Sequence, residues 1–527
     1  MKITIYPLFS TFLLGAITSI LGLLPIASHA ATLASNGSQS DVAVKIASAV
    51  DGDVVTIPAG TFSWTSGVSF SGKGITIRGA GGGWVKGSST TSNTIASSGN
   101  KTFTVAAGLG FETNETITAV QKSDGAVNYM TGTVASYSGT TLVIALTSSG
   151  GSGTYTQWNF RQAGSTIIVN NAGTAVLFMI TEDTTTACHV QNIHFKRGTS
   201  SGEHIIINGG GKPCTISDCR FEEAVSTFAI ELRSPHGIIN SCYFDTGFNW
   251  PRNGAYTGMN TTQFIRMPTV SQTSWTVTTP YGALDVNGDQ NLYIEDCFFH
   301  GAFTEAIDFD GGMRVVFRYN VIDNCGLTSH GADTGNYGLR WFECYNNIFI
   351  YDNMSATQRS APMSYFFYMR GGSGLFTDNV IPDLNSTDYG DKAEISLTVQ
   401  NLQRNGGPYP LWGDNIAGIQ YPAPRQVGMG RVTGTGTSGS VGYNGDPEPV
   451  YQWNNTGGGN YASPAILNYS TPAGSQDNIT GYIQVGRDWL NQPKPNYTKY
   501  TYPHPLRIAP FGVSSPPKNA TVAIYIL

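Results

Sequence analysis

Three short segments share a pattern in which polar side chains alternate with apolar ones. They are residues 229–233 (AIELR), 283–287 (ALDVN) and 306–310 (AIDFD). Successive side chains of a β-strand point to opposite faces, so each segment predicts a strand with its apolar side chains inside and its polar side chains outside. Aligned with one another, the segments predict an exposed ladder of Asn208, Glu231, Asp285 and Asp308, and beside it a second ladder of Arg233, Asn287 and Asp310.

Carboxylates that stack on adjacent strands repel each other, so the predicted acidic ladder needs compensation. One interpretation is a bound Ca²⁺, held by Glu231, Asp285 and Asp308. A second is a shared proton, which would make one member a general acid. Asp308 and Asp310 would lie about 6.6 Å apart at their Cα atoms, from two strand rises, which overlaps the ~6.5–9.5 Å between the carboxyl groups of an inverting glycoside hydrolase. A third interpretation is a solvated outer sheet in which Arg233 and Arg314 neutralise the acids.

Arginine replaces lysine as the cation of the central chain. No lysine occurs between Lys212 and Lys392, whereas arginine recurs throughout that span. Guanidinium groups bind carboxylate and sulfate in a bidentate manner, which suits an acidic polysaccharide. A lyase acting on such a polysaccharide needs a cation to neutralise the uronate carboxylate and a base to remove the adjacent proton. Without lysine, the base would be Arg, His or Tyr, and the candidates that we single out are His300, His330, Arg340 and Arg370.

A 36-residue segment, 245–280, separates two of the predicted strands and is rich in aromatic side chains. A long insertion at the corner of a repeat is a usual place for the wall of a binding site. Aromatic faces stack well on sugar rings, although the same side chains could simply pack the insertion onto the body of the protein. The predicted substrate-binding residues are Arg233, Arg314, Trp250, Tyr256 and Trp275.

The elements that would position these residues form a repeat. Residues 283–297 align with residues 306–320 at a constant offset of 23, which places Glu295 on Arg318. We therefore expect Arg318 to be engaged by Glu295. A period of this length built from β-type residues is typical of a solenoid, in which each repeat is one coil stacked on the next.

A second column of the repeat predicts an inward ladder. Amide side chains stacked along the axis of such a solenoid hydrogen-bond one another, and cysteines in the same column would be buried thiols. A disulfide between Cys219 and Cys242 is the alternative for two of them. The column consists of Cys219, Cys242, Cys297, Asn320, Asn347 and Asn379.

Composition excludes several classes of protein. Charged residues make up 12% of the 527 residues, against roughly 25% in an ordinary soluble domain. The formal net charge of -6 argues against a nucleic-acid partner. The seven cysteines contain no CxxC pair, which argues against a metal-thiolate site.

The first 30 residues read as a secretory signal peptide. Lys2 precedes a long apolar stretch, Pro25 interrupts it, and small residues precede Ala31. An uncleaved membrane anchor is the alternative. We expect a secreted, periplasmic or cell-surface protein that has no membrane segment after cleavage.

Residues 39–80 carry the strongest resemblance to a known family. A short amphipathic helix with Val42, Ile46 and Val50 is followed by the segment 52–62, GDVVTIPAGTF. This arrangement resembles the N-terminal cap and first coils of the pectate lyase-like right-handed parallel β-helix superfamily. Residues 95–161 resemble a small β module that is found as an insert in phage tail proteins.

The resemblance and the repeat together predict an all-β, right-handed parallel β-helix with an N-terminal capping helix and an inserted β subdomain. The implied function is that of a secreted polysaccharide lyase or inverting glycoside hydrolase on an acidic glycan, with Ca²⁺ as the one candidate cofactor. The alternatives are a non-catalytic, tail-spike-like glycan-binding protein and a structural stalk. The predicted divisions are a signal peptide (1–30), cap and first coils (31–94), inserted module (95–161), coils (162–385) and a loop-rich C-terminal region (386–527).

Overall fold

The computed structural model describes most of the chain between residues 30 and 507. No helix among the residues that it describes is long and apolar enough to cross a membrane. The predicted signal peptide lies outside these residues, except for Ala30. The described ranges are 30–81, 85–105, 109, 111, 113–121, 128–162, 165–222, 228–233, 236–245, 263–267, 284–301, 305–323, 325–329, 339–350, 366–383, 395–398, 426–432, 445–466 and 483–507.

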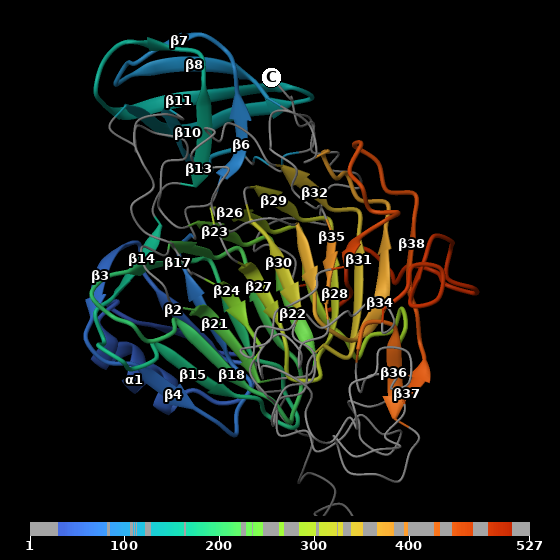
Figure 1. Ribbon diagram of the computed structural model, residues 1–527. Helices are drawn as coiled ribbons and strands as arrows, with labels where there is room; N and C mark the ends of the chain where they lie inside the picture. The colour runs from blue at the N-terminus through green and yellow to red at the C-terminus, as the bar shows by residue number, and fades with distance from the viewer. Residues whose placement is uncertain are drawn as a thin grey trace, which may run out of the picture.

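Three long parallel sheets run side by side along the molecule (Figure 1). Sheet A contains, in spatial order, β1 (Thr32–Ala34), β2 (Val54–Ile57), β5 (Thr76–Gly79), β16 (His189–Gln191), β19 (Cys214–Ser217), β22 (Gly237–Asn240), β25 (Leu292–Glu295), β28 (Arg314–Arg318), β31 (Trp341–Tyr345), β34 (Ser373–Thr377), β38 (Val450–Trp453) and β40 (Trp489–Leu490). Sheet B contains β3 (Gly60–Trp64), β14 (Thr166–Asn170), β17 (Ile193–Arg197), β20 (Arg220–Glu222), β23 (Tyr243–Asp245), β26 (Phe298–His300), β29 (Val321–Asp323) and β32 (Ile348–Ile350). Sheet C contains β4 (Val68–Phe70), β15 (Phe178–Thr181), β18 (Ile205–Asn208), β21 (Phe228–Arg233), β24 (Gln263–Arg266), β27 (Glu305–Phe309), β30 (Leu327–Ser329), β33 (Phe367–Met369), β35 (Ile395–Leu397) and β39 (Ala465–Ile466).

Each central coil contributes one strand to sheet A, then one to sheet B, then one to sheet C. β25, β26 and β27 form one such coil, and β28, β29 and β30 form the next. The apolar faces of the three sheets meet in one continuous core. The chain is a right-handed parallel β-helix, which confirms the predicted fold class.

The predicted inward ladder stands at the corner between sheets A and B. The backbone N–H of Asn320 donates to Oδ1 of Asn347 at 3.0 Å, and that of Asn347 donates to Oδ1 of Asn379 at the same distance. Asn455, which the sequence repeat did not reveal, accepts in the same way from Asn379. All seven cysteines are buried and free, so Cys219 and Cys242 form no disulfide.

A left-handed residue precedes each member of this ladder and makes the corner tight. Seven such residues have φ between 52° and 57°, namely Asp218, Ser241, Asp296, Tyr319, Asn346, Asp378 and Asn454. Short polar side chains tolerate this conformation better than bulky ones. The connection from sheet A to sheet B is therefore short in every one of these coils.

A helix covers the N-terminal end of the coils, as the sequence predicts. The helix α1 (Gln39–Ser48) begins after Ser38, whose side chain accepts from the N–H of Asp41. Val42 and Ile46 are buried against the first coils. Val50 was expected on the same buried face, but it lies beyond the end of the helix and is exposed.

The inserted segment folds into its own antiparallel sheet, drawn in blue and teal at one side of the coils (Figure 1). It starts at Val85, ten residues before the expected boundary, and ends at Gln162. Twelve buried side chains give it a separate core. The strands, in spatial order, are β6 (Val85–Ser89), β13 (Trp158–Gln162), β9 (Thr116–Gln121), β10 (Tyr129–Ser138), β11 (Thr141–Gly150) and β8 (Gly99–Thr104), with a second pair β7 (Asn93–Thr94) and β12 (Thr154–Tyr155). A further antiparallel pair, β36 (Met429–Val432) and β37 (Gly445–Pro447), lies near the C-terminal coils.

The C-terminal segment 494–507 covers the outer face of sheet A. Arg318 and Glu295 form a fully buried ion pair there, with Nη2 and Oε2 2.6 Å apart, as the repeat offset predicts. Arg318 Nη1 and Nη2 also donate to the carbonyl oxygens of Tyr500 and Thr501, each at 2.9 Å. Because buried charges are stable only when they are paired and hydrogen-bonded, this segment completes a network that sheet A cannot satisfy alone.

His504 closes this network and makes it sensitive to acid. Its Nδ1 accepts from the N–H of Leu506, and its ring packs on Tyr293 with 4.2 Å between the centroids. Burial, and then the charge of Arg318, lower the pKa of His504 to about 4.

Acidification from pH 6.5 to pH 4 is therefore expected to destabilise the native protein. The unfolded chain binds a proton at His504 in this range while the native chain does not, so the free energy of unfolding falls as the pH falls. His504→Asn keeps a side-chain acceptor for Leu506 and should reduce the proton uptake on unfolding at pH 5 by about one proton. The slope of unfolding free energy against pH measures this uptake. An unchanged slope in the variant would show that His504 titrates normally in the native protein.

Candidate functional site

One outward column of sheet C brings together several polar side chains far apart in sequence. Glu231 pairs in register with Arg266, and Arg266 pairs with Asp308. We call the whole set the sheet C column, and its members are Glu231, Arg266, Asp308, Thr328, Tyr368 and Ser396. Glu231 and Asp308 thus share one ladder, as predicted, but they are separated by a strand that carries an arginine.

The other members of the predicted acidic ladder are wrong. Asn208 pairs with Arg233 and not with Glu231, so its alignment was displaced by two residues. Asp285 lies in the turn before β25, where its Oδ2 accepts from the N–H of Gln290 at 2.6 Å. The turn adjoins the apolar cluster under the C-terminal segment, on the outer face of sheet A. The offset of 23 is real for β25 and β28, but it does not extend back to a strand at Asp285.

The second predicted ladder also fails. The backbone N–H of Asn287 donates to Glu343 Oε1 at 2.7 Å, and its side chain donates to Thr498 at 2.8 Å. Asn287 therefore belongs to the covered face of sheet A, and Arg233 has Asn208 as its neighbour instead.

Arg266 was missed because its strand lies inside the segment that the sequence analysis treated as one excursion. The strand β24 is formed by residues 263–266, and Phe264 and Ile265 are buried in the core. The pattern Phe264-Ile265-Arg266-Met267 resembles the other sheet C strands and could have revealed it. An alignment that includes this strand places a cation between the two acids.

Arginines provide the compensation that the acidic ladder requires. Arg233 forms an ion pair with Glu231, and Arg266 Nη1 lies 4.0 Å from the other oxygen of that carboxylate. The Arg266 guanidinium also stands over the ring of Phe228, 4.6 Å from its centroid. Glu231 is 6% exposed at its side chain, whereas the two arginine side chains are 44% and 41% exposed. The guanidinium groups are thus the accessible part of this arrangement.

Asp308 and Asp310 lie on the same side of the chain at the end of β27. Asp308 is 6% exposed and Asp310 is half-buried. Asp310 Oδ1 accepts from the N–H of Gly311 at 2.8 Å. The next strand places Thr328 beside Asp308; this side chain is fully buried, and its hydroxyl has no hydrogen-bond partner among the described residues. Carboxyl and hydroxyl groups therefore adjoin on neighbouring strands.

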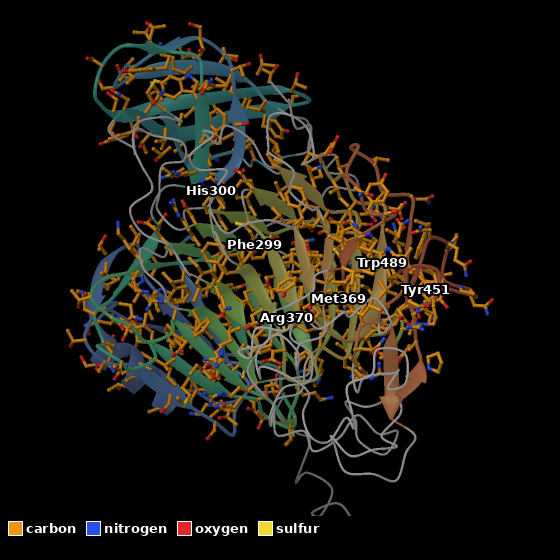
Figure 2. All side chains as sticks on the ribbon, in the orientation of Figure 1. Phe299, His300, Met369, Arg370, Tyr451 and Trp489 are labelled. Atoms are coloured by element: carbon orange, nitrogen blue, oxygen red, sulfur yellow. The ribbon has the colours of Figure 1, made fainter. Side chains whose placement is uncertain are left out.

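Arg370 follows the column on the next strand. Its Nε donates to the carbonyl oxygen of Ser329 at 2.9 Å, and its guanidinium stands 5.2 Å from the centroid of the Tyr368 ring. Figure 2 labels Arg370 on this side of the coils, well away from His300, which lies towards the inserted sheet. A tyrosine hydroxyl and a cation thus extend the sheet C column beyond Thr328.

The structure does not bring the three predicted Ca²⁺ ligands together. Of its three ligands, Asp285 lies on another face of the protein, and Glu231 is engaged by two arginines. No group of three or more His, Cys, Asp or Glu side chains suited to a metal ion occurs among the residues that the structure describes.

Of the remaining predicted site residues, two arginines are described by the structure and four other residues are not. Arg314 begins β28 in sheet A and donates to the carbonyl oxygen of Gln290 at 2.8 Å, so it does not neutralise the sheet C acids. Arg340 is buried before β31 and pairs with Glu448 at 2.8 Å. The others lie outside the described residues, namely His330, Trp250, Tyr256 and Trp275.

Long connections leave sheet C at both of its edges in the coils that carry the column. Residues 246–262 connect sheet B to β24, and residues 267–291 connect β24 to sheet A. The connection from β30 of sheet C to β31 of sheet A consists of residues 330–340, and the connection from β32 of sheet B to β33 of sheet C consists of residues 351–366. Because loops on one face of a solenoid usually build its binding surface, this distribution distinguishes sheet C from the tightly closed corner between sheets A and B.

No family model matches the chain, and no curated protein matches it. Solved structures with a similar fold include an alginate lyase from Paenibacillus sp. str. FPU-7, with 10% identity, a TM-score of 0.31, and coverage of 82% of this chain and 97% of that chain. The tailspike protein gp49 from Pseudomonas phage LKA1 has 13% identity and a TM-score of 0.20, over 62% of this chain and 67% of that chain. The Gp54 tailspike of Acinetobacter baumannii bacteriophage AP22, solved with a capsular saccharide, has 9% identity and a TM-score of 0.21, over 82% and 76%. At these TM-scores the similarities say nothing about where this chain would bind a ligand.

Sheet B carries a second set of polar side chains that the sequence analysis did not assemble. Lys196, Glu222, Asp245, His300 and Asp323 occupy one outward column on five successive strands. His300 Nδ1 lies 2.9 Å from Asp323 Oδ2, and Glu222 is 3.1 Å from Lys196. The alternation of apolar and charged residues in IHFKR and RFE could have indicated this column, but only the register shows that its members are neighbours.

Proposed function

We propose that this protein is an exported enzyme that binds and cleaves an acidic polysaccharide along the outer face of sheet C. The observation that carries the proposal is the sheet C column itself, in which buried Asp308 adjoins the accessible guanidinium of Arg266. Burying ionisable side chains on an outer face costs free energy, and such costs are typical of functional sites. The exposed arginines would bind the carboxylates of the glycan.

The carboxyl pair supports inverting hydrolysis as the first candidate reaction. One of Asp308 and Asp310 would donate a proton to the glycosidic oxygen, and the other would accept a proton from a water molecule. That water would attack the anomeric carbon from the opposite face as the bond to the leaving sugar breaks. Their Cα atoms are separated by two strand rises, about 6.6 Å, which suits two carboxyl groups with water between them.

Tyr368 favours β-elimination as a second candidate reaction. Its ring lies beside the Arg370 guanidinium, and it occupies the same column as Arg266. In this reaction an arginine would neutralise the uronate carboxylate, and Tyr368 as the phenolate would remove the proton next to it. The C–O bond to the leaving sugar would then break, the leaving oxygen would take the proton from the Tyr368 hydroxyl, and an unsaturated uronate would remain at the new end.

Incubation of the mature protein with a panel of uronate-containing and neutral polysaccharides tests the proposal. New reducing ends without ultraviolet absorbance would indicate hydrolysis, and reducing ends with the absorbance of an unsaturated uronate would indicate elimination. Retention of a glycan without either product would support the alternative of a non-catalytic glycan-binding protein. Failure to bind or cleave any acidic member of the panel would contradict the assignment to acidic polysaccharides.

A Tyr368→Phe variant is expected to separate the two reactions. Loss of a general base typically lowers the rate by about 10²- to 10⁴-fold, so the variant should lose nearly all turnover if the reaction is elimination. Hydrolysis by the carboxyl pair should fall less than about tenfold, because the phenolic hydroxyl then contributes at most one hydrogen bond. Initial rates of product formation at saturating glycan measure the difference.

A further inference from the structure

Arg161 is half-buried where the inserted sheet meets sheet B. It lies on β13, where Trp158 and Phe160 belong to the core of the inserted sheet. Because side chains alternate along a strand, Arg161 points away from that core. The residue is half-buried, and its buried Nε has no hydrogen-bond partner among the described residues. Another part of the protein therefore covers the Nε of Arg161.

The part of the protein next to Arg161 is the outer face of sheet B. The groups whose charges act on Arg161 all lie on β20 and β23, namely Arg220, Tyr243, Asp245 and Glu222. Burial lowers the pKa of Arg161, and the like charge of Arg220 is the next largest cause. Two guanidinium groups thus face the same space from two separate sheets.

Arg220, like Arg161, has a buried Nε–H group that lacks a hydrogen-bond acceptor among the described residues. Its Nη2 lies 3.3 Å from Asp245 Oδ2 and 3.5 Å from Glu222 Oε2, and its guanidinium stands over the ring of Tyr243. The side chain is 10% exposed. Its Nε is buried and, in the part of the chain that the structure describes, has no acceptor. The two acids therefore occupy one edge of the guanidinium and leave another edge unsatisfied.

The acids beside these two arginines are shared with other side chains of sheet B. Lys196 Nζ lies 3.1 Å from Glu222 Oε1, so the carboxylate of Glu222 is shared between a lysine and Arg220. Burial lowers the pKa of His194 to about 4, so this neighbour of Glu222 is neutral at pH 7. Lys196, Arg220 and Arg161 therefore share the two acids Glu222 and Asp245, while Asp323 of the same column pairs with His300.

We propose that Arg161 and Arg220 form a binding site for an oxyanion between the inserted sheet and sheet B. Buried N–H donors without acceptors cost free energy, and guanidinium groups match the oxygen geometry of carboxylate and sulfate groups. An anion held by both arginines would satisfy both Nε–H groups and remove the repulsion between them. The ligand is a carboxylate or sulfate group, either free in solution or carried by a sugar. This site is separate from the sheet C column and does not depend on the reaction proposed there.

Calorimetric titration of the full mature chain with inorganic sulfate and, separately, with glucuronate tests this site. All titrations are made at pH 7 and at one ionic strength set with sodium chloride. The wild type should bind at least one of the two anions saturably. Arg161→Gln should weaken this binding by about tenfold or more, which is the usual effect of losing a charged hydrogen-bonding partner.

A charge-matched variant is the control. Lys101→Gln removes one cation from the inserted sheet and should bind the anion as the wild type does. Arg161→Lys should keep part of the affinity and shows whether a loss in Arg161→Gln follows from the charge or from unfolding of the inserted sheet. Binding of glucuronate alone would identify a sugar-borne carboxylate as the ligand, and binding of sulfate would identify a general oxyanion site. Absence of binding to the wild type, or equal affinity in Arg161→Gln, would overturn the proposal.

Discussion

An Asp308→Asn variant is expected to lose about 10²- to 10⁴-fold of its turnover on an acidic glycan, the range typical of losing a general acid or base. The substitution keeps the size and shape of the side chain but removes its ability to exchange a proton. Binding of the glycan should change little, because the exposed guanidinium groups of Arg233 and Arg266 remain. Initial rates at saturating glycan and the affinity for the glycan, measured separately, check both parts of the expectation. Asp310→Asn should behave similarly if the two carboxyl groups act as a pair.

Asp285→Asn is the matched control. Asp285 is the residue that the 23-residue offset aligns with Asp308, yet it lies in a turn on another face. Its asparagine variant keeps an oxygen that can accept from the N–H of Gln290, so it should retain full activity. Full activity in Asp308→Asn, or equal losses in Asp308→Asn and Asp285→Asn, would refute the sheet C site.

Removal of Arg318 is expected to produce the largest loss of stability. Arg318→Met should lower the free energy of unfolding by about 3–5 kcal/mol, because Glu295 would be left buried without its cation. This is a large part of the ~5–15 kcal/mol that stabilises an ordinary domain. The carbonyl oxygens of Tyr500 and Thr501 would also lose their donors, so the C-terminal segment should detach first. Denaturant unfolding measures the loss, and limited proteolysis after residue 490 measures the detachment.

The double variant Arg318→Met with Glu295→Leu separates pairing from burial. It should recover most of the lost stability, because apolar side chains of similar volume can replace a buried ion pair at little cost. Arg233→Met removes an ion pair whose arginine is 44% exposed and leaves Arg266 beside Glu231, so it should cost about 1 kcal/mol or less. A cost for Arg318→Met as small as that for Arg233→Met would show that the buried pair contributes no more than a surface pair.

Local pattern determined which face of each strand is inside. Alternation in AIELR and AIDFD places Ile230, Leu232, Ile307 and Phe309 inside, and the structure confirms this. Glu231 and Asp308 lie outside that core, but they are buried and not exposed as expected. The column that ends in Asn320, Asn347 and Asn379 was also correct, because each member follows a strand at the same short distance. Such features depend on neighbours within a few residues, and those neighbours are visible in the sequence.

Stacking between coils was decided by the tertiary structure. The offset of 23 pairs Glu295 with Arg318, since no insertion interrupts the chain between β25 and β28. The same offset misplaces Asp285, because the connection between β24 and β25 replaces a strand with a turn. Arg266 instead becomes the neighbour of both Glu231 and Asp308, across long connections.

The sequence by itself therefore determined the solenoid, its N-terminal cap, the inward Cys/Asn ladder and the outward orientation of the acids. Only the tertiary structure decided which acids are neighbours, that arginine separates them, and that Arg161 of the inserted sheet faces Arg220 of sheet B. The physical reason is that a strand's inside and outside follow from its own alternation. Its partners depend on how much chain lies in the connections between coils, and long connections of varying length carry no periodic signal.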